Sequence, residues 1–112
     1  MSRRILTGAL AMSLAAVLGG ASPATGGEFT TRAKIVDRAF QPKRIEIGQG
    51  TRVKWVNKGD EVHTVTSNTG LFDSGSLAPG DSFAKRFKDT GVFRFHCEEH
   101  PEMRGKVLSI DV

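Results

Sequence analysis

The chain has 112 residues, of which 38% are hydrophobic and 25% are charged, with a formal net charge of +4 at pH 7. This length supports one hydrophobic core rather than several domains. A single cysteine excludes an intrachain disulfide, and the lack of a basic run or of interleaved aromatic residues argues against a nucleic-acid partner.

The N-terminal segment has the pattern of a targeting sequence. Arg3 and Arg4 form a positive n-region, residues 5–20 are almost all apolar or small, and small residues follow them. A transmembrane anchor is the alternative, but a span needs about 20 apolar residues and this run is shorter and rich in Ala and Gly. We therefore predict a signal peptide over residues 1–24 and a periplasmic protein formed by residues 25–112. Removal of the signal peptide lowers the formal charge of the chain to +2, with 14 Lys and Arg against 12 Asp and Glu.

The remaining chain has the pattern of short strands separated by turns. Ala78 to Asp81 places Pro and Gly at the positions that a type II turn favours. No stretch has helical periodicity. Strands of period two with turn signals between them predict an antiparallel β-sandwich or barrel. The predicted strands are residues 29–36, 44–47, 51–56, 62–67, 82–87, 91–96 and 106–112.

Three potential metal ligands recur near the C-terminus. Cys97, His100 and Met103 place a thiolate, an imidazole and a thioether at every third residue. Soft sulfur and borderline nitrogen donors suit copper, and a trigonal copper site needs a second imidazole, for which His63 is the candidate. A His2Cys set with a weak axial Met is typical of blue-copper electron-transfer centres. Zinc is the alternative metal, and each residue taken singly could also be an ordinary core or loop side chain.

Strand alternation separates the histidines into ligand candidates and a surface residue. Phe93, Phe95 and Cys97 share one face of their strand, which we expect to face the core. His96 then points to the other face, and we predict that it is a surface residue although it precedes the cysteine. His100 lies in the following loop, where it can reach back toward Cys97 while one ring edge stays near the surface.

Several motifs resemble those of the plastocyanin and amicyanin family of cupredoxins, the type 1 blue copper proteins. The resemblance covers about residue 28 to the end, and the two-residue gap between His100 and Met103 matches amicyanin. It implies a Greek-key β-sandwich of seven or eight strands with one copper ion at one end, held by His63, Cys97 and His100 with Met103 axial. The motifs are Ala39-Phe40-Gln41-Pro42, Ile45-Glu46-Ile47, Val53-Lys54-Trp55-Val56-Asn57, His63-Thr64-Val65-Thr66, Phe72-Asp73-Ser74-Gly75 and Pro79-Gly80.

Two features depart from the family pattern. Thr64 follows the first ligand histidine, where Asn is common and braces the cysteine loop, so we predict that Thr64 lies next to the ligands in the second shell. Glu98, Glu99 and Glu102 replace apolar residues of the amicyanin loop. With two more acidic residues at 60 and 61, they are either ordinary loop charge or an acidic rim that attracts a basic partner.

The sequence therefore predicts an exported, monomeric one-electron carrier that cycles between Cu(I) and Cu(II) and has no enzymatic activity. The expected partners are redox proteins such as a c-type cytochrome or a periplasmic dehydrogenase, with no membrane span in the mature form. A periplasmic copper-binding or chaperone protein is the alternative, but an open, Met-rich site is expected there and only one methionine follows residue 12. A copper enzyme needs further copper centres, which three histidines do not supply.

Overall fold

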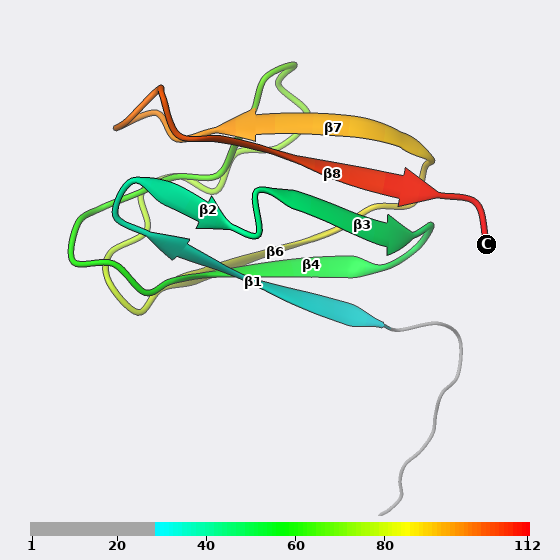
Figure 1. Ribbon diagram of the computed structural model, residues 1–112, viewed down its shortest axis with the longest axis horizontal. Helices are drawn as coiled ribbons and strands as arrows, with labels where there is room; N and C mark the ends of the chain where they lie inside the picture. Colours follow the sequence, from blue (N-terminus) through cyan, green and yellow to red (C-terminus); the bar gives the residue numbers. More distant parts are fainter. Residues whose placement is uncertain (1–28) are drawn as a thin grey trace, which may run out of the picture.

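The computed structural model describes residues 29–112, which form two four-stranded sheets packed face to face (Figure 1). The strand orders are β2-β1-β4-β6 and β3-β8-β7-β5. The first sheet contains β1 (Thr30–Val36), β2 (Ala39–Gln41), β4 (Arg52–Asn57) and β6 (Ser82–Arg86), and the second contains β3 (Arg44–Gly48), β5 (Thr66–Ser67), β7 (Gly91–His96) and β8 (Arg104–Ile110). The predicted all-β sandwich of seven or eight strands is confirmed, whereas the predicted signal peptide lies outside the described residues.

The sheets are mixed, so the prediction of purely antiparallel pairing is wrong for two pairs. β1 pairs with β4 in parallel, and β3 pairs with β8 in parallel. Turn signals report only strands that follow each other directly, and each of these pairs has other strands between its members. Among the described residues, no helix is long and apolar enough to cross a membrane.

The strand expected over residues 62–67 is shorter in the structure, and one strand was not expected. Only Thr66 and Ser67 form β5, while His63 makes an isolated bridge with Leu77. Residues 63–67 are all buried, so this segment does not expose alternate side chains as a half-buried strand does. The additional strand is the three-residue β2, which pairs with the end of β1.

Aromatic rings fill the space between the sheets. Trp55 of β4 is fully buried and meets Phe95 of β7 edge to face at 5.3 Å between ring centroids. Phe95 lies against the backbone of β8 at Gly105, where an added Cβ would come within 2.5 Å of the ring. The inward face of β7 thus continues from Phe93 and Phe95 to Cys97 at the end of the core, as the alternation predicted. The loop that follows, residues 97–103, lies at the end of the sandwich away from the C-terminus (Figure 1).

Candidate metal centre

The structure brings three of the predicted ligands together at this end of the sandwich. The Nδ1 atoms of His63 and His100 each lie 3.8 Å from Sγ of Cys97. All three donor atoms lie within 4.8 Å of one another. His63 comes from the segment before β5, whereas Cys97 and His100 come from the loop between β7 and β8.

The spacing of these donor atoms fits a bound metal ion. Metal–sulfur and metal–nitrogen bonds of about 2.3 and 2.0 Å, the lengths found at zinc, separate two donors by about 3.7 Å at a trigonal angle. The observed separations of 3.8 Å match that value. Two imidazoles with one thiolate form a donor set that suits copper.

Cys97 and Met103 are connected by backbone hydrogen bonds within residues 97–103, which we call the ligand loop. The Cys97 N–H donates to the Met103 carbonyl at 3.1 Å, and the Met103 N–H donates to the His100 carbonyl at 2.8 Å. Both side chains are buried, with 0% of Cys97 and 2% of Met103 exposed. The backbone N–H of Thr64 donates to Sγ of Cys97 at 3.4 Å, which connects the segment before β5 to the cysteine.

The side chain of Thr64 begins a directed chain of hydrogen bonds beside the loop. Its Oγ1 accepts the Glu98 N–H at 2.8 Å and lies 2.9 Å from Oγ1 of Thr66. Thr66 donates in turn to Oδ1 of Asp73 at 3.2 Å, so the Thr64 hydroxyl donates to Thr66. Aligned hydrogen bonds of this kind strengthen one another, and they connect the ligand loop to the segment before β5.

His63 is held from its other side by Asp37, a residue that the sequence analysis did not identify. Nε2 of the fully buried His63 lies 2.9 Å from Oδ1 of Asp37. Because Nδ1 faces Cys97, Nε2 carries the proton and donates to the carboxylate. A carboxylate behind a metal-ligating histidine fixes the tautomer and the orientation of the ring.

Asp37 is itself fixed by backbone groups of the loop after β4. It accepts the N–H groups of Asp60 and Glu61 at 3.0 to 3.2 Å. The hydrogen bond from His63, followed by that from the Asp60 amide, lowers the pKa of the Asp37 carboxyl below its ordinary value. Gly59 leaves the necessary space, since a Cβ there would overlap Oδ1 of Asp37.

His100 lies at the surface of the cluster. Its side chain is 28% exposed, and its Nε2 lies 3.2 Å from Oε1 of Glu61. The predicted exposed ring edge is therefore present, but a carboxylate faces it. The carboxylate of Glu61, one of the acidic residues that the sequence placed at this end, thus lies next to a candidate ligand.

His96 stands apart from the donor cluster, which confirms its predicted surface position. Its Nδ1 lies 2.6 Å from Oδ1 of Asn68 and its Nε2 lies 2.7 Å from Oε2 of Glu98. The side chain is 24% exposed on the outer side of β7.

Comparisons with known proteins give a family match and several relatives of this chain. Residues 8–108 match the family model described as a cupredoxin-like domain. The chain is 29% identical to amicyanin of Paracoccus denitrificans over 91% of this chain and 82% of the relative, and 28% identical to plastocyanin of Scenedesmus fuscus over 54% and 74%.

Solved structures share the fold. A reduced mutant of amicyanin superimposes with a TM-score of 0.69 at 20% identity, covering 76% of this chain and 86% of that one. A purple cupredoxin from Nitrosopumilus maritimus gives a TM-score of 0.60 at 34% identity, covering 63% and 81%.

Proposed function

Because this chain belongs to the cupredoxin family, we propose that it is an exported type 1 copper protein that carries single electrons between redox partners. The observation that carries the proposal is the donor set of His63, Cys97 and His100, with only His100 reaching the surface. A trigonal N2S copper site with a distant thioether suits Cu(I) and Cu(II) alike, so an electron is exchanged with little rearrangement.

Each proposed ligand has a role that follows from its position. Cys97 supplies the thiolate, and its burial protects it from oxidation. His63 anchors the site from the interior, where Asp37 holds its ring. His100 would offer the electron a path through its exposed edge, and Met103 would supply the weak thioether ligand that tunes the reduction potential.

Thr64 and Asp37 position the ligands without binding the metal themselves. Thr64 contacts Cys97 through its backbone and Glu98 through its hydroxyl, so it holds the start of the ligand loop. Asp37 holds His63 in the required tautomer. We propose that both residues fix the donor atoms before the metal arrives, which keeps the geometry rigid in both oxidation states.

The proposal includes the cellular setting and the type of partner. We propose that residues 1–24 direct export to the periplasm and that the mature protein is a monomer that serves soluble redox proteins, a c-type cytochrome or a dehydrogenase among them. A copper chaperone is less consistent with the site. Ready metal exchange needs accessible ligands, whereas His63 and Cys97 are fully buried.

Titration with Cu(II) tests the proposal. The purified protein is expected to develop an intense visible thiolate-to-copper band that ascorbate bleaches and ferricyanide restores. Cys97→Ser is expected to abolish the band, while the matched control His96→Asn keeps it because His96 lies outside the cluster. A colourless protein that takes up zinc in preference to copper would overturn the assignment.

A further inference from the structure

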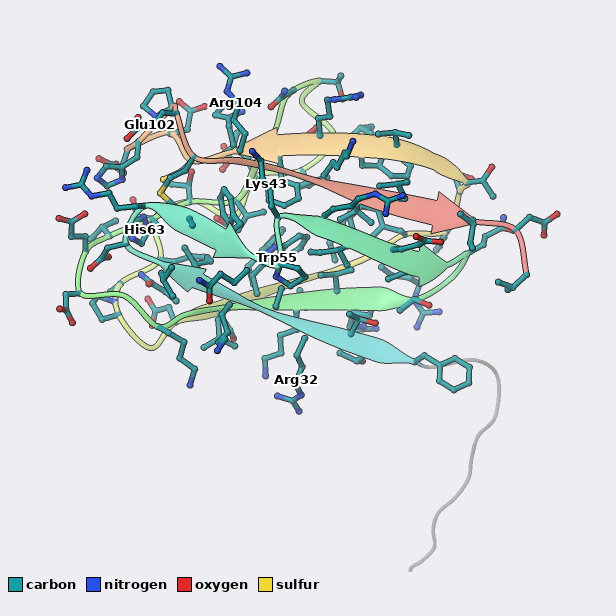
Figure 2. All side chains as sticks on the ribbon, in the orientation of Figure 1. Arg32, Lys43, Trp55, His63, Glu102 and Arg104 are labelled. Atoms are coloured by element: carbon teal, nitrogen blue, oxygen red, sulfur yellow. The ribbon has the colours of Figure 1, made fainter. Side chains whose placement is uncertain are left out.

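The outer face of the second sheet carries a basic groove close to the ligand loop. A cavity of about 330 Å³ opens between β3, β8 and β7, with Phe95 and Gly105 also contributing to its lining. Figure 2 shows Arg104 pointing outward at the start of β8, beside the loop that carries Glu102. The polar and cationic residues of the groove are Lys43, Arg44, Asn68, Arg94, Arg104 and Lys106.

Strand register places three of these cations side by side. Arg94 of β7 lies opposite Lys106 of β8, and Lys106 lies opposite Arg44 of β3. Like charges directly opposite each other destabilise a sheet. The fold therefore holds an electrostatically unfavourable row across three strands.

Little within the protein neutralises this row. Arg44 has a carboxylate of Glu46 at 3.6 Å. Within residues 29–112, Lys43, Arg94, Arg104 and Lys106 make no ion pair. Their charge is available to an external anion.

The groove continues toward the proposed electron path. A neighbouring cavity of about 340 Å³ shares Asn68 and Arg104 with the groove and is also lined by His96 and Pro101. Pro101 directly follows His100 in the ligand loop. A macromolecule that fills both cavities would therefore contact Pro101, in the loop whose histidine reaches the surface.

In the part of the chain that the structure describes, both outer faces of the sandwich carry cations, but only the groove on the second sheet lies next to a cavity that is lined by a residue of the ligand loop. On the first sheet Arg32 lies opposite Lys54, and Figure 2 shows Arg32 projecting from that side of the molecule. The cavity there, of about 700 Å³, is lined by residues of β1, β2 and β4 and their flanks, and by no residue of the ligand loop.

We infer that the basic groove docks an acidic surface of a redox partner protein. The inference rests on the proposed function, because it identifies the kind of partner that exchanges the electron. Carboxylates of the partner neutralise the row Arg44–Lys106–Arg94, and its redox centre comes to rest beside His100. One electron passes from the reduced site to the oxidised partner, and no proton or bond is exchanged.

The acidic residues of the loops near the site do not by themselves favour a basic partner. Glu98 is engaged with His96, and Glu61 faces His100. The groove and these carboxylates place opposite charges on adjacent surfaces. A partner with an acidic surface next to its redox centre fits this pattern in one orientation. The charges would then raise the association rate and fix the orientation of the partner in the complex.

Two forms of one redox protein test the inference: basic cytochrome c and the same cytochrome with its lysines succinylated, which makes it acidic. Electron transfer from the reduced copper protein to each is followed by stopped flow at several salt concentrations. The test variant is Arg94→Glu/Lys106→Glu. The control Arg32→Glu/Lys54→Glu makes the same charge change at an equivalent cross-strand pair of the other sheet.

The wild type is expected to react faster with the acidic cytochrome, at a rate that falls as salt rises. The test variant should lose about tenfold of that rate at low salt and the control less than about twofold, because steering depends on local charge. Equal losses in both variants, or a faster reaction of the wild type with the basic cytochrome, would overturn the inference. So would binding of phosphatidylglycerol vesicles that the test variant loses while its rate with the acidic cytochrome is unchanged.

A separate measurement distinguishes this failure from failure of the proposed function. Reduction by ascorbate needs no docking surface, so all variants should retain the copper band and its bleaching. Loss of both in the wild type would contradict the copper assignment itself, whereas their retention with unaltered cytochrome rates would contradict the docking surface alone.

Discussion

The two histidines of the site occupy contrasting surroundings. His63 is 0% exposed and is held by Asp37, which the amides of Asp60 and Glu61 fix in turn. His100 is 28% exposed, and the carboxylate that faces it belongs to a side chain that is itself 55% exposed. One imidazole is thus positioned by the folded interior, and the other by a short loop at the surface.

This contrast separates two tasks within the proposed metal site. The interior half, formed by His63, Cys97 and Met103, would set donor geometry and exclude water. The surface half, formed by His100, connects the site to whatever approaches it. Substitutions in the interior half should therefore change metal binding and stability, whereas those at the surface half should change exchange with partners and small ligands.

The largest effects are expected when each of the two imidazoles is removed in turn. His63→Gly leaves a cavity and an Asp37 carboxylate without its partner, so we expect a loss of about 2–3 kcal/mol in the free energy of unfolding and no restored copper band when imidazole is added. His100→Gly opens the site to solvent, so added imidazole should restore the band. Urea denaturation and visible titration measure both effects. Restoration of the band in both variants would show that burial does not separate the two ligands.

The carboxylates behind the two histidines give a smaller test. Asp37→Asn removes the charged acceptor of His63 Nε2, and we expect copper affinity to fall by about 10- to 100-fold, as for other partners of metal-ligating histidines. Glu61→Gln changes an exposed contact of His100 and should alter affinity by less than about threefold. Competition with a copper chelator measures the copper affinity of both variants. The NMR chemical shifts of the His63 ring nitrogens in the metal-free protein report the tautomer. Equal losses would contradict the contrast.

The hydroxyl of Thr64 allows a test inside the interior half. Thr64→Val leaves the Glu98 N–H without an acceptor and removes the hydroxyl that donates to Thr66, and we expect a loss of about 1–3 kcal/mol in the free energy of unfolding of the metal-free protein. Thr64→Ser keeps the hydroxyl and should recover most of this loss. If valine and serine behave alike in urea denaturation, the hydrogen-bond chain does not hold the loop.

Parts of the site that lie close together in sequence could be predicted, whereas contacts between distant segments could not. Cys97, His100 and Met103 fall within one loop, so their spacing was readable, and alternation along β7 separated Cys97 from His96. Asp37 reaches His63 across 26 positions, through a turn with no ligand motif and past Gly59, which leaves space for the carboxylate. The basic row likewise needs the register of β7 on β8 and of β8 on β3, which no local pattern reports.

Acid stability of the metal-free protein gives the smallest and most specific test. The pKa of Asp37 in the folded state lies below its ordinary value, so its carboxylate stabilises the fold at pH values above about 4, and this contribution is lost as pH falls through the lowered folded pKa. Urea midpoints measured from about pH 6 to about pH 2 should therefore fall less steeply for Asp37→Asn than for the wild type. Glu61→Gln is the matched control, because its carboxylate lies on the surface half and should leave the acid limb of the curve in place. An unchanged limb in Asp37→Asn would mean that the Asp37 carboxylate does not stabilise His63 in the folded state.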